Sequence, residues 1–224
     1  MNMISRLGVV LVALVVLILA GAASWTQQDR TPPAPPLPAP QLSGGMPLAE
    51  ALAARRSIRQ FAPTPLTPPQ LGQLCWAAQG ITDAQGKRTA PSAGALYPVE
   101  LFVVTPAGVQ HYKPQTHTLE PHLPGDLRPD LSRAALSQDT AANAPAVFVI
   151  SAEVSRTAVK YGPRAERYCF LEAGHVAQNI LLQATALELC GVPMGAFEDA
   201  EVARVLKLPP GFQPLYLVAV GQAK

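Results

Sequence analysis

The stretch RAERYCFLEAGHVAQNILLQATALELC, residues 164–190, is the longest segment of helical character in this chain of 224 residues. Gly191 follows it directly, and glycine very commonly ends a helix. Pro193 comes two residues later and cannot continue one. The sequence therefore predicts one long helix over residues 164–190, and the elements around it decide the fold class.

Apolar runs on both sides of this helix predict β-strands. Residues 146–150 (AVFVI) form a continuous branched run that is typical of a buried strand, and residues 215–220 (LYLVAV) predict a last, central strand. Residues 100–105 (ELFVVT) predict another strand. Residues 109–112 and 118–122 predict a hairpin, because a short polar segment with a proline lies between them.

Three shorter helices complete the pattern. Residues 47–56 begin with a proline, residues 68–79 follow Thr67, which suits a helix N-cap, and residues 199–206 form a short helix. Helices and strands are mixed without a strict βαβ alternation. The sequence therefore predicts an α+β fold.

The N-terminal part of the chain differs in composition from the rest. Residues 7–23 are almost wholly aliphatic or small and follow Arg6, which is typical of a signal-anchor or a signal peptide over residues 1–24. An uncleaved hydrophobic helix that anchors the chain in a membrane is favoured, although Ala20-Gly21-Ala22 resembles a cleavage site. The positive charge before the apolar run places the rest of the chain outside the cytoplasm, periplasmic or secreted if the segment is cleaved.

A proline-rich segment separates this N-terminal region from the domain. Residues 25–46 include TPPAPPLPAP and predict an extended linker, because proline at this density blocks both helix and sheet. The folded domain is then expected over residues 47–224.

Composition and motifs exclude several functions. A net charge of +2 disfavours nucleic acid as a main partner, because backbone phosphates need a basic stripe. The 49% hydrophobic content is too high for a disordered chain. The sequence has no dinucleotide-binding glycine motif, no nucleophile elbow and no Walker motif. The three cysteines predict buried free thiols. The histidines lack metal-ligand spacing, so no metal site is expected, and those near the hairpin are expected at the surface: His111, His117 and His122.

The segment Arg55-Arg56-Ser57-Ile58-Arg59 places three guanidinium groups within five residues, beside a hydroxyl group. Cations at this spacing repel one another unless an anion gathers them, and arginine forks match phosphate oxygens in pairs. The pattern indicates a phosphate site, with a solvated basic face as the alternative. Two segments rich in small residues, 90–98 and 191–197, would let backbone amides approach a ligand, although plain turns explain them equally well.

Taken together, in this order and spacing, these segments resemble the nitroreductase family of FMN-dependent oxidoreductases. Within it they are most similar to the branch of thiazole- and oxazole-forming peptide dehydrogenases. The resemblance covers nearly all of residues 48–221 and implies a mostly antiparallel central sheet flanked by helices. The motifs that carry it are RRSIRQF (55–61), LCWAAQGIT (74–82), PSAGALYPVELFVV (91–104), KYGPRAERY (160–168), LEAGHVAQNILLQATALEL (171–189) and GAFED (195–199).

The resemblance also implies how the chain would hold FMN. The basic segment would bind the phosphate, and the small-residue segment of a partner subunit would line the ribityl chain and ring. The Gly195 N–H, with Ala196 beside it, would meet flavin N5, while Gln178 and Asn179 would support the site. Family members are usually intertwined homodimers, so a homodimer is expected. The implied cofactor-binding residues are Arg55, Arg56, Ser57, Arg59, Ser92, Ala93, Gly94, Ala95, Gly195 and Ala196.

Two positions depart from the family pattern. Ala95 stands where many members have an asparagine, and Gln222 stands where a late basic residue usually reaches the phosphate. Lys224 would have to substitute for that cation. These departures keep open a membrane-tethered flavin-binding module without turnover.

The pair Lys160-Tyr161 resembles the Lys-Tyr pair that peptide dehydrogenases of this branch use to oxidise azolines. Either side chain could move the proton that accompanies hydride loss, so both are candidate catalytic residues. A lysine at a helix start and a packed tyrosine are the alternative interpretation.

The resemblance thus implies an FMN-dependent oxidoreductase that works in two half-reactions. A small-molecule donor would pass hydride to flavin N5, and a small-molecule acceptor would then take the electrons. Azoline oxidation on a peptide is the alternative activity. Nicotinamide coenzymes are scarce outside the cytoplasm, so an extracytoplasmic domain would need another partner, such as a quinone.

Overall fold

The computed structural model describes residues 34–224. The apolar segment that predicts a membrane anchor or signal peptide lies outside these residues. Within the described part of the chain, no helix is both long and apolar enough to cross a membrane.

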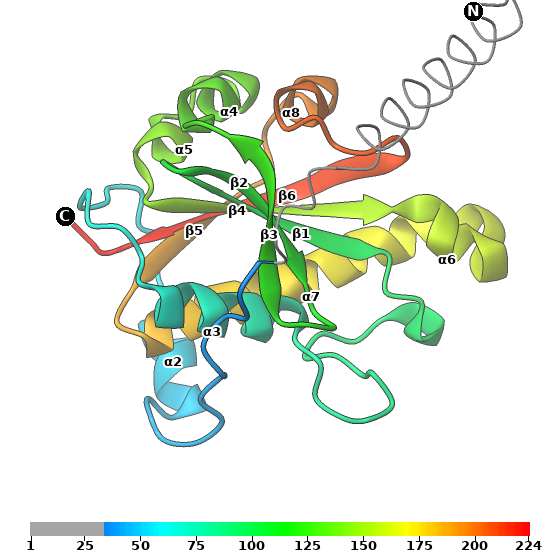
Figure 1. The fold of residues 1–224 in the computed structure, drawn as a ribbon, viewed down its shortest axis with the longest axis horizontal. Helices are drawn as coiled ribbons and strands as arrows, with labels where there is room; N and C mark the ends of the chain where they lie inside the picture. The colour runs from blue at the N-terminus through cyan, green and yellow to red at the C-terminus, as the bar shows by residue number, and fades with distance from the viewer. Residues whose placement is uncertain (1–33) are drawn as a thin grey trace, which may run out of the picture. The chain divides into compact units, whose positions relative to one another are not determined.

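One six-stranded antiparallel sheet, in the order β3-β2-β1-β4-β6-β5, forms the centre of the domain (Figure 1). Helices flank it, so the predicted α+β class and mostly antiparallel sheet are confirmed. The strands are β1 (Val99–Thr105), β2 (Gly108–Lys113), β3 (Thr118–Pro124), β4 (Ala146–Glu153), β5 (Cys190–Met194) and β6 (Phe212–Gly221). The helices are α2 (Leu48–Ala54), α3 (Pro68–Gln79), α4 (Arg128–Ala134), α5 (Asp139–Asn143), α6 (Val154–Tyr161), α7 (Ala165–Ala186) and α8 (Asp199–Val205), with 3-10 turns η1 (Ala93–Ala95) and η2 (Gly162–Arg164).

The strands β4 and β6 lie inside the sheet, each between two other strands, and β4 and the last half of β6 are buried. Residues 146–152 of β4 are all buried, as the continuous apolar run predicts. Phe148 of β4 lies opposite Val218 of β6 in the register. This pair of strands supplies side chains to both layers of the core.

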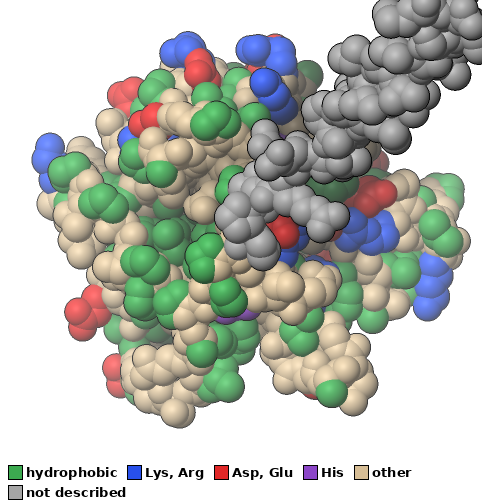
Figure 2. Space-filling view, viewed as in Figure 1, with side chains coloured by type: hydrophobic (Ala, Val, Ile, Leu, Met, Phe, Trp, Pro, Cys, Tyr) green, Lys and Arg blue, Asp and Glu red, His purple; other side chains and the backbone are tan. Residues whose placement is uncertain are grey.

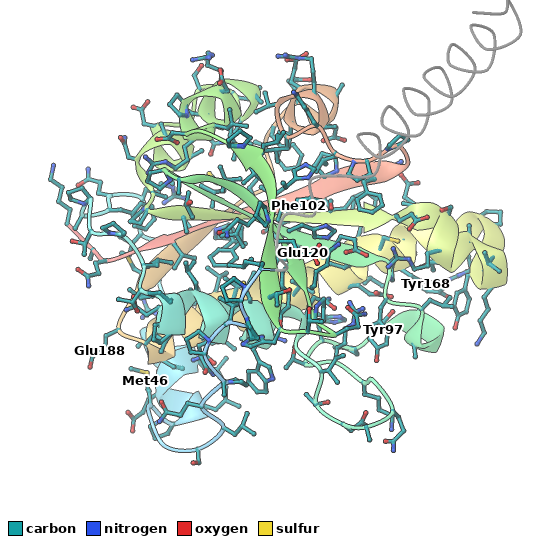
Figure 3. All side chains as sticks on the ribbon, viewed as in Figure 1. Met46, Tyr97, Phe102, Glu120, Tyr168 and Glu188 are labelled. Atoms are coloured by element: carbon teal, nitrogen blue, oxygen red, sulfur yellow. The ribbon has the colours of Figure 1, made fainter. Side chains whose placement is uncertain are left out.

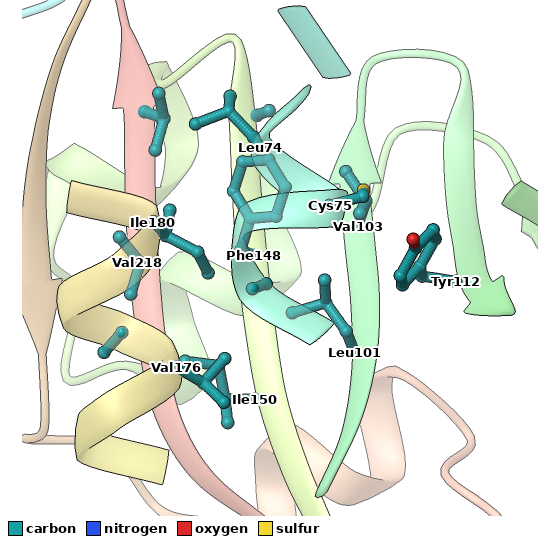
Figure 4. Packing of buried hydrophobic residues seen from close by; sticks show 14 of the residues in the cluster. Leu74, Cys75, Leu101, Val103, Tyr112, Phe148, Ile150, Val176, Ile180 and Val218 are labelled. Carbon is teal, nitrogen blue, oxygen red and sulfur yellow. The ribbon is translucent and has the colours of Figure 1, made fainter. Parts of the chain in front are cut away.

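The long helix α7 and the helix α3 pack together on one face of the sheet (Figure 1). Leu74 of α3 and Val176 and Ile180 of α7 lie in one apolar cluster with Leu101 and Phe148 of the sheet (Figure 4). A capping box begins α3: the Thr67 side chain accepts from the Gln70 N–H, and the Gln70 side chain bonds the Thr67 backbone. The predicted N-cap is therefore confirmed.

The other face of the sheet is covered by the short helices α4, α5 and α8 (Figure 1). Leu131, Ala141 and Val202 from these helices form a second cluster with Phe102 and Val149. Side chains of alternate positions in β1 and β4 therefore enter different cores, which fixes the register of each strand.

The predicted helix over residues 164–190 is too long. The helix α7 ends at Ala186, Glu188 turns the chain with a positive φ of 59°, and Cys190 begins the edge strand β5. Gly191 is required there, because a Cβ would lie 2.9 Å from the Ala219 carbonyl oxygen of β6. Pro193 is tolerated because an edge strand does not use every backbone N–H in hydrogen bonds to a neighbouring strand. The prediction of a helix stop at Gly191 was therefore wrong, because residues 190–194 form a strand, whereas residues 195–197 lie outside any helix or strand. The Cys190 thiol is half-buried rather than buried.

Residues 34–41, here called the strap, contact the domain. The Leu37 N–H donates to the His117 carbonyl at 2.8 Å. The buried Gln73 of α3 accepts from the Gln41 N–H at 2.7 Å and donates to the Gln41 carbonyl at 3.2 Å. Part of the segment that composition marks as a linker thus packs on α3.

Charged side chains lie mainly around the periphery of the face shown in Figure 2, with hydrophobic side chains between them. The uncovered part of this face carries no continuous basic stripe.

Candidate functional site

A strained loop joins α3 to the sheet and carries the predicted small-residue segment. Within residues 92–97, here called the loop 92–97, three residues have positive φ: Gly94 at 62°, Ala95 at 54° and Tyr97 at 49°. L side chains rarely adopt this conformation, and such strain concentrates at functional sites. The Ser92 hydroxyl accepts from the Tyr97 N–H at 2.8 Å, so the loop is closed by one of its own side chains.

Lys160 and Tyr161 converge on this loop. They are the last two residues of α6, not the start of the next helix. A Cβ placed on Gly94 would lie 3.0 Å from the Tyr161 hydroxyl oxygen and 3.1 Å from Lys160 Nζ. The structure thus brings the two predicted catalytic side chains to the predicted flavin-contacting loop.

The ring of Tyr161 packs against the ring of Tyr168. The two rings meet edge-to-face at a centroid distance of 4.9 Å, which is a favourable geometry. Figure 3 places Tyr168 and Tyr97 toward the same end of the domain, where α6 meets the loop 92–97. The Lys160 ammonium lies 5.5 Å from the Tyr161 ring centre.

Glu172 of α7 lies beneath the loop, and reasoning from the sequence did not select it. Its Oε1 accepts from the Ala93 N–H at 2.8 Å, and the residue is only 5% exposed. Burial raises the pKa of its carboxyl group, and the Ala93 hydrogen bond opposes that rise only in part. A signal was available, because Glu172 falls within the apolar stripe formed by Cys169, Ala173 and Val176.

An ionic network anchors the other end of the loop. Arg156 of α6 donates to the Tyr97 carbonyl at 2.6 Å and pairs with Glu153 at 2.7 Å and Glu100 at 2.9 Å. Glu100 also lies 2.8 Å from His111 Nε2. Burial pulls the pKa of Glu100 upward, but the hydrogen bonds from His111 and Arg156 outweigh it and the net pKa is lowered.

His111 is not the surface residue that the sequence predicts. Its side chain is only 14% exposed, and its ring stacks on Phe102 at a centroid distance of 4.3 Å. Lys113 Nζ lies 2.9 Å from Nδ1 of the ring. Because the ammonium can only donate, His111 holds its proton on Nε2 and donates it to Glu100.

The predicted phosphate-binding segment lies along the edge strand β5. Ser57 forms a parallel bridge with Gly191, and the Ile58 N–H donates to the Gly191 carbonyl at 3.2 Å. Gly195 comes directly after β5 and is exposed. It lies four residues beyond Gly191, which is about 13 Å at the rise of a strand. The strand thus connects the basic segment to the predicted N5 contact.

Arg56 and Arg59 of this segment are exposed, and Arg55 is half-buried. Arg56 Nη1 donates to the carbonyls of Ala53 and Arg55, and within residues 34–224 no carboxylate pairs with any of the three. Arg59 and Lys224 line the same cavity of about 540 Å³, where Asp139 contributes one acid. The Lys224 N–H donates to the Gln60 carbonyl at 3.3 Å, which holds this lysine beside the segment.

The predicted site residues therefore form two groups. Arg55, Arg56, Ser57, Arg59, Gly195 and Ala196 lie at the β5 edge, whereas Ser92 to Ala95, Lys160 and Tyr161 gather around the loop. No hydrogen bond or ion pair among the described residues joins the groups. Asn179 donates to the carbonyls of Ala77 and Thr89, which is a structural role, and Gln178 is exposed.

Comparison with known proteins identifies the family to which this chain belongs. The model of the nitroreductase family matches residues 52–222. A protein from Methanocaldococcus jannaschii that is named as a nitroreductase is 41% identical over 181 residues, which cover 78% of this chain and 90% of the relative. The chain therefore belongs to the nitroreductase family.

Solved structures share the fold. A nitroreductase of Ralstonia eutropha has a TM-score of 0.77 at 30% identity, over 86% of this chain and 95% of that one. A chain of the E. coli microcin synthetase McbBCD complex has a TM-score of 0.67 at 22% identity, over 92% and 82%. The NADPH:FMN oxidoreductase of Vibrio harveyi, complexed with NAD+, has a TM-score of 0.61 at 23% identity, over 79% and 69%. At these lower identities, the last two comparisons show the fold alone.

Proposed function

We propose that this nitroreductase-family oxidoreductase depends on FMN and transfers hydride through flavin N5 in two half-reactions. The observation that carries the proposal is the attachment of the basic segment to β5. It puts three arginines without a carboxylate ion-pair partner among the described residues near one end of the strand, and the exposed Gly195 follows the other end. When bound, FMN would supply the hydride chemistry, and the chain would supply binding and orientation.

The residues present fit a phosphorylated flavin. Arg55, Arg56 and Arg59 offer charge-assisted donors for the phosphate, and Ser57 offers a hydroxyl group. No carboxylate of the described residues forms an ion pair with these arginines, although Asp139 lines the same cavity as Arg59. Lys224 lines a cavity with Arg59 and takes the place of the late family cation that Gln222 lacks. The Gly195 N–H would orient flavin N5, with Ala196 beside it.

A homodimer would unite the two groups of site residues. Ser92 to Ala95 of one subunit would then line the flavin held by the basic segment of the other. Support comes from apolar side chains left in solvent on α7, where Phe170 and Leu171 are each 54% exposed, and on α2, where Leu48 is 66% exposed. Small-molecule donors and acceptors would reach the open flavin in turn.

Azoline oxidation on a peptide is a second candidate activity, favoured by the convergence of Lys160 and Tyr161 on Gly94. One of these side chains would take the proton released as hydride leaves the substrate. The variant Lys160→Ala separates the two activities. Nitro or quinone reduction should survive it, whereas azoline oxidation should collapse.

The location of the domain is part of the proposal. A single N-terminal apolar helix over residues 1–24 would anchor the protein in a membrane, with the domain outside the cytoplasm. A topology reporter fused after Lys224 tests this placement. Reporter activity restricted to the cytoplasm would contradict it.

The experiment that tests the main proposal is reconstitution. Purified protein supplied with FMN should turn yellow, bleach with a reductant and regain its colour on addition of a nitroaromatic or quinone acceptor. Protein that binds flavin but shows no turnover would instead support the flavin-binding module. Protein that takes up no FMN would refute the proposed function.

A further inference from the structure

The loop 92–97 is held from both ends by different helices. At its start, Glu172 of α7 accepts from the Ala93 N–H at 2.8 Å. At its end, Arg156 of α6 donates to the Tyr97 carbonyl at 2.6 Å. Between these contacts lie Gly94, Ala95 and Tyr97 with their positive φ angles. A loop of left-handed residues persists only where its surroundings hold it. The two helix contacts therefore hold the loop together with its own Ser92–Tyr97 hydrogen bond.

The helix α6 links the second contact to the candidate catalytic pair. Arg156 and Lys160 are four residues apart and therefore lie on the same face of this helix. Arg156 holds the Tyr97 carbonyl, while Lys160 and Tyr161 approach Gly94. A shift of the loop would therefore change its distance to both Lys160 and Tyr161.

We propose that Glu172 is a positioning residue that fixes the loop 92–97 through the Ala93 N–H and so sets the placement of Gly94 against Lys160 and Tyr161. Arg156 is the second anchor of the same loop. The functional part of this proposal rests on the proposed flavin chemistry, because it assumes that the loop lines the flavin site.

The identity of the residue supports this role. A carboxyl group that is 5% exposed is costly to bury, and the surrounding stripe of α7 is otherwise apolar. A hydrogen bond from a backbone N–H to a carboxylate is stronger than one to a neutral acceptor. Glu172 thus places a carboxyl oxygen beside the Ala93 N–H, at the start of the strained turn.

Hydrogen exchange of the purified chain tests the positioning claim without any cofactor. Glu172→Leu removes the acceptor, so amides of the loop 92–97 should exchange at least tenfold faster, while amides of β4 and β6 keep their rates. Glu172→Gln keeps a neutral acceptor and should give an intermediate rate. The control Val176→Ala disturbs the same helix without touching the loop and should leave the exchange rate of the loop unchanged.

Equal loop exchange in Glu172→Leu and the original protein would overturn the proposal. If Glu172→Leu does not fold, Glu172→Gln decides the question: faster exchange confined to the loop supports the proposal, and unchanged exchange overturns it.

A second measurement addresses the flavin site. In FMN-loaded protein, Glu172→Leu should lower kcat for azoline oxidation at least fivefold, because that activity depends on Lys160 and Tyr161. Val176→Ala, which is destabilised without loop displacement, should leave this kcat within twofold. If the loop exchanges faster in Glu172→Leu but FMN affinity and kcat are unchanged, the role of Glu172 in the flavin site is overturned. If the original protein takes up no FMN, the proposed function fails, but the exchange measurement still decides whether Glu172 holds the loop.

Discussion

Replacing Gly94 by alanine tests whether the loop 92–97 and the Lys160-Tyr161 pair form one functional unit. Gly94 has a φ of 62°, and its new Cβ would lie 3.0 Å from the Tyr161 hydroxyl oxygen and 3.1 Å from Lys160 Nζ. Gly86 provides a matched control. It has a φ of 78°, and a Cβ there would meet no atom within 4 Å.

The expected stability change is similar in both variants. An alanine in the left-handed conformation destabilises the fold by about 1–2 kcal/mol. Alanine also lowers the conformational entropy of the unfolded chain, which stabilises the fold by about 0.4–1 kcal/mol. The net loss is about 1 kcal/mol, or about 2–4 °C in Tm for a domain of this size. The side-chain ends of Lys160 and Tyr161 can move, so the close contacts at Gly94 add little to that loss.

The expected change in activity differs. Gly94→Ala displaces both side-chain ends by a few tenths of an ångström, and a displacement of about 1 Å can cost about a hundredfold in rate. We therefore expect kcat for azoline oxidation to fall about three- to tenfold in Gly94→Ala and to stay within twofold in Gly86→Ala. Urea unfolding and steady-state kinetics of both variants measure the two effects. Equal kcat in the two variants would refute the idea that Lys160 and Tyr161 act at Gly94.

Three further predictions concern other parts of the fold. Gln73→Leu leaves the Gln41 backbone groups without their partner, so unfolding free energy should fall by about 1–3 kcal/mol and limited proteolysis near the strap should accelerate. Gly191→Ala forces β5 away from β6, so Tm should fall and FMN should bind more weakly in a titration, because Ser57 and Ile58 attach at Gly191. The pKa of Glu100 is lower in the folded protein than in the unfolded chain, so its ionised form stabilises the fold. This stabilisation is complete above the unfolded pKa of about 4.3 and is lost as the pH falls through the folded pKa. The Tm of Glu100→Gln and of the original protein should therefore converge under acid, and Tm profiles that stay parallel down to pH 3 would contradict this.

Continuous apolar runs in the sequence predicted the two strands at the centre of the core. The apolar runs at 146–150 and 215–220 became β4 and β6, because a strand buried on both faces leaves a continuous apolar signal in sequence. The hairpin of β2 and β3 and the helix α3 were predicted from turn and cap residues, which act locally.

The elements that the sequence did not predict lack apolar runs, turn residues or cap residues that would mark them. The strand β4 continues directly into α6 at Val154, so no loop residues mark the boundary. The edge strand β5 contains Gly191 and Pro193, which usually end helices, and only pairing with β6 makes it a strand. The helices α4 and α5 are seven and five residues long, too short to show a periodic pattern.

The same distinction holds for the site. The phosphate-binding interpretation of residues 55–59 rests on a local spacing of charges that sequence displays directly. The meeting of Gly94 with Lys160, and of Ala93 with Glu172, joins residues far apart in the chain. Only the family resemblance pointed to Lys160 and Tyr161, and nothing local showed that the buried stripe of α7 carries a carboxylate toward a backbone N–H.

The most direct test of the central claim is an FMN titration of the original protein and of Arg59→Ala, followed by flavin fluorescence. Arg133→Ala is the matched control, because this exposed arginine of α4 pairs only with Asp130 among the described residues. Loss of a charged contact to phosphate costs about 1.5–3 kcal/mol, so Arg59→Ala should weaken saturable FMN binding by about ten- to a hundredfold while Arg133→Ala binds normally. Absence of saturable binding to the original protein, or equal affinity in all three proteins, would contradict the account.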